Sequence, residues 1–313
     1  MADLTKKIGS LDVFPLSLGG NVFGWTADRD ASFAVLDAYA AGGGNFVDTA
    51  DGYSAWVPGH QGGESEETIG AWVAGRRNRD DVVIATKVGA HPRFKGLAPA
   101  NIKAAAEASL RRLGTDRIDL YYTHFDDTSV PVEDIIGALD ELVRAGKVRE
   151  IAASNISAER LEASLAASER DGLARYAALQ PHYNLVSRDT YEGELRDAVT
   201  RHGLAAVPYY GLASGFLTGK YRPGADVDSP RAGRAAEYLK SARGPKVLEA
   251  LDTVAAEQGV EVAAVALAWL GAQPTVVAPI ASARGVDQLP PLLAAARTEL
   301  TADQLALLDR ASA

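Results

Sequence analysis

Short apolar runs alternate along the chain with longer segments whose apolar residues are spaced three or four apart. A short run bounded by turn residues is typical of a buried strand, and the wider spacing is typical of a helix with one inward face. Regular alternation of the two predicts a parallel sheet covered by helices. The eight predicted strands are residues 14–20, 45–50, 82–89, 118–124, 150–155, 177–184, 204–211 and 275–281.

Eight strand–helix repeats in 313 residues favour an α/β fold of the (β/α)8 TIM-barrel type. A doubly wound nucleotide-binding sheet is disfavoured because no G-x-G-x-x-G turn follows the first predicted strand. Residues 6–14 predict a short β-hairpin ahead of the barrel. No linker or shift in composition interrupts the chain, so we expect a single domain over residues 1–313.

Turn and cap residues mark the expected helix ends. Ser157 and Thr301 each precede a helical pattern and are predicted helix starts. Glycines such as Gly114 follow helix ends, where they commonly stop a helix. The longest irregular piece, residues 218–245, is rich in Gly, Pro, Arg and Lys, and a loop of that length often forms part of a binding site.

Composition then narrows the possible partners. A net charge of −9 argues against nucleic acid or an anionic membrane as the main partner. The chain has no cysteine, which excludes a disulfide framework and a thiolate nucleophile and suits a reducing compartment. The N-terminal segment has no apolar run like that of a signal peptide, and no apolar run reaches membrane-spanning length. We expect a cytoplasmic monomer that acts on a small molecule.

Polar side chains stand where three neighbouring predicted strands end. Asp48 ends the second strand and Tyr53 lies in the loop behind it, while Lys87 ends the third strand and His124 the fourth. In a (β/α)8 barrel the chemistry is placed at the carboxyl ends of the strands, so these four side chains are expected to meet.

Their chemistry is that of a proton donor aimed at a carbonyl group. A free tyrosine has a pKa near 10, and a nearby ammonium such as that of Lys87 is expected to lower it. Asp48 would hold the lysine, and His124 would orient a substrate oxygen by hydrogen bonding. No residue supplies electrons, so a bound cofactor is required for reduction.

Each of these residues alone is more often structural than functional, and their combination carries the hypothesis. Asp119 starts the fourth strand, at the opposite end of the barrel, and is expected to be structural. Asp51 is expected to cap a turn. The five histidines show no metal-ligand spacing, so no metal site is expected.

Longer segments extend the pattern and resemble one known family. They are "FVDTADGYS", "IATKVG", "LRRLGTDRIDLYYTH", "GKVREIAASN", "LQPHYN" and "LASGFLTGKYR". In order and spacing they resemble the aldo-keto reductase superfamily over nearly the whole chain. The resemblance implies a (β/α)8 barrel and reduction of an aldehyde or ketone by NADPH, or the reverse reaction. By position, the catalytic residues it implies are Asp48, Tyr53, Lys87 and His124.

The resemblance also implies a cofactor site. Ser154, Asn155 and Gln180 match positions that hold the nicotinamide carboxamide, and amide and hydroxyl groups offer the donors and acceptors that this requires. Tyr209 matches an aromatic residue that stacks on the nicotinamide ring. The expected pyrophosphate and adenosine contacts are Gly211, Leu212, Ser214, Gly215, Lys220, Ser282, Arg284 and Gln288.

Several positions depart from the pattern of relatives. Tyr210-Gly211 stands where relatives often carry Ser-Pro, and Pro291 and Leu292 replace two polar adenine contacts. Arg284 is expected to bind a 2′-phosphate, so NADPH is preferred and NADH remains possible. The long loop 54–63 is expected to bring Trp56 or His60 over the substrate. The expected substrate contacts are Asn21, Phe23, Trp25 and Trp56.

Other functions remain open from the sequence. A nicotinamide-nucleotide-binding regulatory subunit with little turnover, like the β subunits of potassium channels, would share this barrel. A Schiff-base aldolase would use Lys87 as its nucleophile. The substrate itself is not fixed by the sequence, because the loops of this fold vary independently of the barrel.

Overall fold

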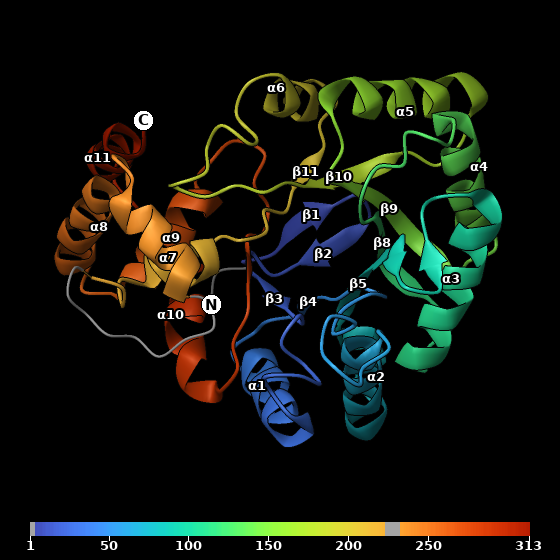
Figure 1. Ribbon diagram of the computed structural model, residues 1–313, viewed down its shortest axis with the longest axis horizontal. Coiled ribbons are helices and arrows are strands. Elements are labelled where there is room, and N and C mark those ends of the chain that lie inside the picture. The colour runs from blue at the N-terminus through green and yellow to red at the C-terminus, as the bar shows by residue number, and fades with distance from the viewer. Residues whose placement is uncertain (1–3, 223–231) are drawn as a thin grey trace.

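The computed structural model describes residues 4–222 and 232–313. Eight parallel strands form a ring with helices around it (Figure 1). Each lies within or beside a predicted strand, so the predicted (β/α)8 barrel is confirmed. In ring order the strands are β11 (Ala205–Ala206), β10 (Tyr176–Gln180), β9 (Val148–Ser154), β8 (Ile118–Thr123), β5 (Val83–Val88), β4 (Phe46–Asp48), β3 (Ser17–Gly19) and β12 (Ile280–Ala281).

Hydrogen bonds between β11 and the segment that leads into β12 close the ring. The Ala206 amide donates to Thr275 O at 2.8 Å, and the Val277 amide donates back to Ala206 O at 2.9 Å. The regular parts of β11 and β12 are only two residues long, much shorter than the predicted runs. Prolines 208, 274 and 279 lie in or beside these runs and have no N–H for a ladder bond, which explains the shortening.

The predicted N-terminal hairpin is present and closes one end of the barrel. β1 (Lys6–Ile8) pairs antiparallel with β2 (Leu11–Val13). Ile8, Leu11 and Val13 are buried in one cluster with inward-facing strand residues. Figure 1 shows this hairpin across the centre of the ring. The opposite end, where the strands have their carboxyl termini, is left to the connecting loops.

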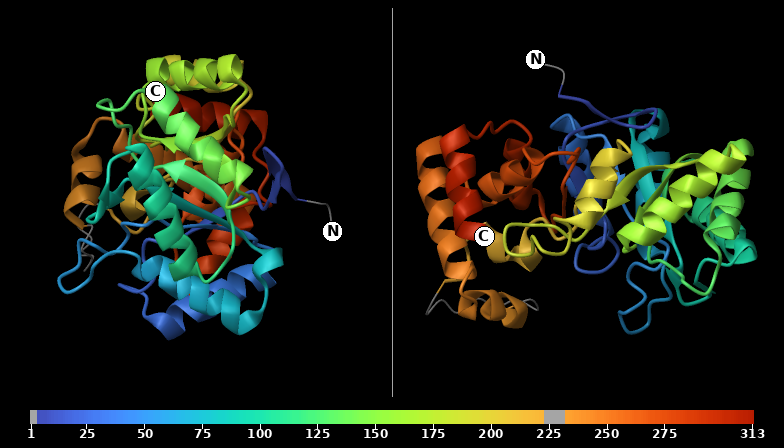
Figure 2. Two further views of the ribbon diagram at one scale, coloured as in Figure 1. Left: turned by 90° about the vertical axis from the view of Figure 1, so that its right-hand side faces the viewer. Right: turned by 90° about the horizontal axis from the view of Figure 1, so that it is seen from above.

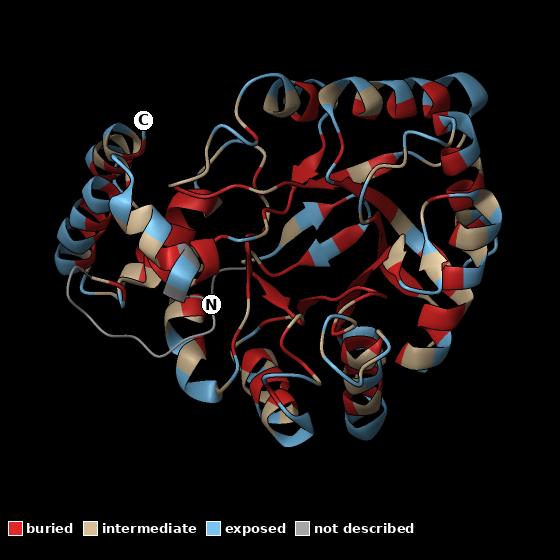
Figure 3. Ribbon diagram, in the orientation of Figure 1, coloured by how far each residue is buried: buried red, intermediate tan, exposed pale blue. Residues whose placement is uncertain are grey.

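Helices surround the ring and bury the main hydrophobic core against it, with their outer faces exposed (Figures 2 and 3). Ser157 and Thr301 are helix N-caps as predicted, and Thr301 forms a full capping box with Gln304. The α-helices are α1 (Arg29–Ala41), α2 (Glu64–Arg76), α3 (Pro99–Leu113), α4 (Val132–Arg144), α5 (Ala158–Asp171), α6 (Glu194–Arg201), α7 (Ala232–Lys240), α8 (Gly244–Gln258), α9 (Val262–Gly271), α10 (Leu289–Ala295) and α11 (Ala302–Ser312).

Two local expectations differ from the structure. The stretch 218–245, predicted to be irregular, contains α7 and the first residues of α8, and its residues 223–231 lie outside the described residues. A hairpin that the sequence did not predict follows β5, formed by β6 (Ala90–His91) and β7 (Phe94–Lys95). Its strands of two residues are too short to show an alternating pattern.

Within the described chain, no single helix has the length and apolar character needed to cross a bilayer. α8 and α9 pass such a test only when counted together, and their axes are bent by 97°.

Candidate active site

The four expected catalytic side chains come from neighbouring strands and converge at their carboxyl ends. Lys87 Nζ lies 2.6 Å from Asp48 Oδ2 and 3.0 Å from the Tyr53 hydroxyl. It also donates to Thr49 O at 2.8 Å. The Tyr53 hydroxyl lies 3.5 Å from Asp48 Oδ2, and the Tyr53 and His124 rings meet edge to face with centroids 5.9 Å apart. The barrel therefore gathers a lysine, a carboxylate, a phenol and an imidazole.

The pKa of Tyr53 differs from the sequence-based expectation. Loss of solvent and the adjacent Asp48 carboxylate raise the pKa of Tyr53 well above its ordinary value. The predicted lowering by Lys87 is therefore corrected, because desolvation and Asp48 together outweigh the ammonium. Burial also lowers the pKa of Lys87, against the pull of Asp48. Tyr53 is accordingly held in its protonated form, and its raised pKa makes it a weaker acid than a free tyrosine.

His124 is neutral at ordinary pH. Burial, assisted by the charge of Lys87, lowers the pKa of His124 to about 3. Its Nδ1 atom is buried and has no hydrogen-bond partner in the described chain. A neutral imidazole carries one N–H donor, which is what a carbonyl oxygen requires.

The three residues expected to hold a carboxamide lie beside the catalytic group. Gln180 Nε2 donates to Asp48 Oδ1 at 2.9 Å, and Ser154 Oγ donates to the Gln180 carbonyl oxygen at 2.8 Å. Asn155 Nδ2 donates to Ser154 Oγ at 3.1 Å and to His124 O at 2.8 Å. Asp48 thus has one carboxylate oxygen on Lys87 and the other on Gln180.

Tyr209 lies next to this polar group. Its hydroxyl donates to Asn155 Oδ1 at 2.7 Å. Its ring stacks on that of His182, with centroids 5.4 Å apart and an interplanar angle of 22°. An aromatic face therefore stands close to the amide and hydroxyl groups, in the arrangement expected for a flat ring with an amide substituent.

The loop expected to line the pyrophosphate has an unusual backbone. Ala213, Ser214 and Gly215 all have positive φ angles, of 46°, 58° and 94°. The Ala213 amide donates to Tyr210 O at 2.7 Å and the Gly215 amide to Leu212 O at 2.8 Å, so these two amides are satisfied within the loop. Lys220 lies against this loop, since a Cβ built on Gly215 would be 3.7 Å from Lys220 Nζ. Gly211 is tightly packed, and an added Cβ there would be 2.9 Å from Leu267.

The expected adenosine-side residues lie after β12. The Arg284 amide donates to Gln288 Oε1 at 2.9 Å, and the Arg284 side chain is exposed and makes no ion pair with any described residue. Ser282 Oγ donates to Asn21 Oδ1 at 2.6 Å. Asn21, expected to contact substrate, is thereby bound to the predicted cofactor side of the site.

Aromatic residues border the catalytic group on its exposed side. Trp25 and Trp56 meet edge to face at 5.6 Å, and Trp56 is 6.1 Å from the Tyr53 ring. Trp56 is 53% exposed. The expectation for Phe23 is corrected, because this side chain is completely buried in the core instead of lining an open surface.

Sequence analysis missed one residue at this place. Phe125 stacks on the His124 ring at 4.7 Å with an interplanar angle of 14°, and it is 52% exposed. The available signal was its position directly after a histidine that ends a barrel strand. Exposed aromatic rings on both sides of the catalytic group form an apolar rim.

The structural roles predicted for Asp119 and Asp51 compare differently with the structure. Asp119, at the start of β8, pairs with Arg79 at 2.8 Å and accepts from the Ile84 amide at 2.9 Å, as expected of a structural residue. Asp51 was expected to cap a turn, and its side chain makes no capping bond at full hydrogen-bonding geometry within the described chain. It is fully buried, and the Gly52 and Gly89 amides approach its carboxyl group without any described donor reaching full hydrogen-bonding geometry.

An eight-stranded α/β barrel with a lysine-supported tyrosine at the carboxyl ends of its strands defines a class of barrel suited to acid-assisted carbonyl chemistry. Comparison of the sequence then identifies the family. The model of the "Aldo/keto reductase family" matches residues 15–313, and the chain belongs to this family.

Curated relatives cover almost the whole chain. "Norsolorinic acid reductase B" of Aspergillus parasiticus is 32% identical over 96% of this chain and 81% of its own length. "Uncharacterized oxidoreductase YrpG" of Bacillus subtilis is 34% identical over 96% of this chain and 92% of its own. "Probable voltage-gated potassium channel subunit beta" of Arabidopsis thaliana is 32% identical over 91% of this chain and 88% of its own.

Proposed function

We propose that this protein is an NAD(P)H-dependent reductase that converts an aldehyde or ketone to an alcohol. The observation that carries the proposal is the position of Lys87 Nζ, 2.6 Å from Asp48 and 3.0 Å from the Tyr53 hydroxyl, at the carboxyl ends of the barrel strands. A protonated phenol held by an ammonium is a general acid for a carbonyl oxygen. The family and its oxidoreductase relatives support the same chemistry.

Each residue of the group has a distinct role in this proposal. Tyr53 donates its proton to the carbonyl oxygen as negative charge develops there. Lys87 stabilises the resulting phenolate, and Asp48 fixes Lys87 and keeps it charged. Neutral His124 donates its N–H to the same oxygen and aligns it. The exposed aromatic rim limits access of water to the reacting carbon.

The residues present fit a nicotinamide cofactor. Ser154, Asn155 and Gln180 form one hydrogen-bonded group beside Asp48, and they offer the donors and acceptors that a carboxamide needs. Tyr209 supplies the adjacent aromatic face. When bound, the reduced nicotinamide supplies the hydride that this chain lacks. The chain's own contribution is to hold the ring near Tyr53 and to protonate the substrate.

The phosphate-binding residues favour NADPH in the same proposal. The ammonium of Lys220 lies beside the loop that contains Gly211, Leu212, Ser214 and Gly215, and it suits a pyrophosphate. Ser282 and Gln288 flank the adenosine end. Arg284 has a free guanidinium that suits a 2′-phosphate.

The rim points to an apolar, aromatic carbonyl substrate. Trp25, Trp56 and Phe125 expose large rings around the catalytic group, and stacking on such rings favours a flat apolar molecule. We therefore place aromatic aldehydes and ketones ahead of small sugars in the order of testing.

A second candidate function is a nucleotide-binding regulatory subunit, and the similarity to the potassium channel β subunit favours it. The two functions differ in turnover. Binding of NADPH and NADH is measured by quenching of tryptophan fluorescence, and oxidation of the nucleotide is then followed with a panel of aliphatic and aromatic carbonyl compounds. We expect tight NADPH binding and fastest turnover with aromatic carbonyls. Binding without turnover would favour the regulator, and absence of binding would contradict both functions.

A further inference from the structure

A buried carboxyl group, two residues before Tyr53 in the chain, takes no part in the mechanism above. Asp51 is completely buried, and neither of its carboxyl oxygens meets a hydrogen-bond donor at full geometry within the described chain. An ionised carboxylate in that position would be very costly, because a buried charge needs a partner. The surroundings of Asp51 decide which form it takes.

The arginine that interacts with Asp51 is already paired with another carboxylate. Arg112 of α3 donates from Nε to Glu66 of α2 at 2.6 Å and from Nη2 to Ser109 at 3.2 Å. The other oxygen of Glu66 accepts from the Thr86 hydroxyl at 2.5 Å. Glu66 is fully buried and fully satisfied, so Arg112 neutralises Glu66. Asp51 is then a second carboxyl beside a single arginine.

Other elements packed around Asp51 do not supply the missing positive charge. Tyr121 of β8 is buried, and its hydroxyl has no partner in the described chain. Lys87 of β5 is close enough to feel Asp51, but it is bound to Asp48. His91 of β6 is buried, and burial with the nearby arginines lowers the pKa of His91. A neutral carboxylic acid is the form of Asp51 that this environment tolerates.

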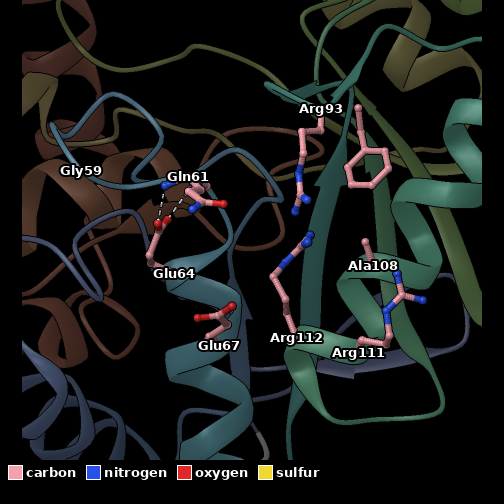
Figure 4. A pocket seen from close by; sticks show the side chains of 10 residues that line it. Gly59, Gln61, Glu64, Glu67, Arg93, Ala108, Arg111 and Arg112 are labelled. Carbon is pink, nitrogen blue, oxygen red and sulfur yellow. Dashed lines mark hydrogen bonds between the residues drawn. The ribbon is translucent and has the colours of Figure 1, made fainter.

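Solvent reaches the edge of this cluster. A groove of about 680 Å³ lies between the loop before α2 and the β6–β7 hairpin with α3, and Arg112 points into it (Figure 4). The Arg112 side chain is 11% exposed, and its partner Glu66 is fully buried. Arg112, which interacts with Asp51 electrostatically, therefore lines the groove, while Glu66 and Asp51 are buried.

Asp51 is also joined to the catalytic group through the backbone. The Asp51 amide donates to Lys87 O at 3.2 Å, and the Tyr53 hydroxyl, two residues later, lies 3.0 Å from Lys87 Nζ. Residues 51 and 53 thus contact the main chain and the side chain of the same lysine. Through these contacts, a displacement of the chain at Asp51 would alter the position of Tyr53 relative to Lys87.

We propose that Asp51 is a positioning residue that supports Tyr53 as a neutral carboxylic acid, and that ionisation of Asp51 displaces Tyr53 and slows proton donation. The effect on the reaction rests on the proposed reductase function, whereas the protonation state of Asp51 and its effect on Tyr53 do not.

The proposal has a defined alkaline signature. Burial, with the charge of Glu66, raises the pKa of Asp51 to about 8, against the opposing charge of Arg112 and backbone hydrogen bonds from Gly89 and Gly52. The pKa of Tyr53 lies well above 10, so Tyr53 itself does not ionise in the same range. Turnover should therefore fall above pH 8, to about a tenth of its neutral value at about pH 9, in step with a single ionisation.

The test is a pH titration of protein labelled with ¹³C in aspartate carboxyl groups and in tyrosine side chains. Asp51→Asn assigns the Asp51 resonance by its loss, and Tyr53→Phe assigns that of Tyr53. We expect the Asp51 carbon to titrate near pH 8 and the Tyr53 resonance to shift at the same midpoint. In Asp51→Asn, which mimics the neutral acid, the Tyr53 shift and the alkaline fall in turnover should both vanish.

Two further variants separate this role from a merely structural one. Asp119→Asn removes an equally buried carboxyl at the other end of the barrel, and it should leave the pH profile unchanged. Glu66→Gln frees Arg112 for Asp51 and should move the midpoint to lower pH, which also tests the proposal if Asp51→Asn does not fold. An Asp51 midpoint near 4, a static Tyr53 resonance, or an alkaline fall that persists in Asp51→Asn would overturn it. Absence of turnover beside the expected resonances would reject only the reductase function.

Discussion

At the scale of single residues, the buried surroundings of a side chain give it a pKa different from the one that its residue type alone suggests. Tyr53 was expected to have a lowered pKa because a lysine lies beside it. The structure shows the opposite direction, because desolvation and Asp48 act more strongly than the ammonium. The identity and convergence of the four side chains followed from their positions at strand ends. Their protonation states did not, because burial depends on packing that the sequence does not display.

His124 gives a prediction about pH. Its pKa is lowered to about 3, so His124 is neutral throughout the range from pH 5 to pH 8 and contributes no break to the rate there. His124→Asn should lower kcat by about a hundredfold or more, the usual loss for a donor to a developing oxyanion. The measurement is kcat as a function of pH for both proteins. A wild-type break near pH 6.5 that disappears in His124→Asn would contradict the neutral assignment.

Arg284 gives a prediction about cofactor choice. Loss of a charge-assisted hydrogen bond to a phosphate costs about 1.5–3 kcal/mol, or roughly tenfold or more in affinity. Arg284→Ala should therefore weaken NADPH binding by at least about tenfold and leave NADH binding within about twofold. Fluorescence titration with both nucleotides measures this, with Arg310→Ala, an exposed arginine on α11, as the matched control. Equal weakening for the two nucleotides would remove the 2′-phosphate role.

At the scale of elements, the order of strands and helices was predictable because each has its own apolar period. The short lengths of β11 and β12 were not predictable. Pro208 and Pro279 interrupt the hydrogen-bond ladder, but the runs that contain them remain apolar. The β6–β7 hairpin could not be predicted from the sequence, because strands of two residues are too short to show an alternating pattern. The burial of Phe23 and the exposure of Phe125 could not be predicted either, because an aromatic residue after a strand can turn either inward or outward.

The N-terminal hairpin gives a prediction about stability. Leu11 is 1% exposed and packs against inward-facing barrel residues. Leu11→Ala should lower the free energy of unfolding by about 2–5 kcal/mol, the usual range for a buried leucine, and leave KM unchanged because the active site is at the other end. Urea unfolding and steady-state kinetics measure the two effects. Lys7→Ala, on the exposed face of β1, is the control. A loss of less than about 0.5 kcal/mol would show that the hairpin does not close the core.

At the scale of the whole molecule, closure of the barrel brings together residues that are distant in the chain. Gln180 bonds to Asp48 across 132 positions, and Ser282 bonds to Asn21 across 261. The hairpin fills one end of the ring, so the catalytic group is reached only from the other. The fold and the convergence of Asp48, Tyr53, Lys87 and His124 were predictable because the sequence keeps strand ends and spacing. The apolar rim and the buried Asp51 were not, because they are products of three-dimensional packing.

The central claim is that Tyr53 donates the proton, and Tyr53→Phe tests it most directly. This change removes one oxygen atom and leaves Lys87, Asp48 and the cofactor residues in place. The measurement is the rate of nucleotide oxidation in a single turnover with an aromatic aldehyde, together with NADPH affinity. The account predicts a loss of about a thousandfold or more in rate, within the range known for general acids, with NADPH affinity within about twofold. A mutant that keeps wild-type turnover would contradict the account.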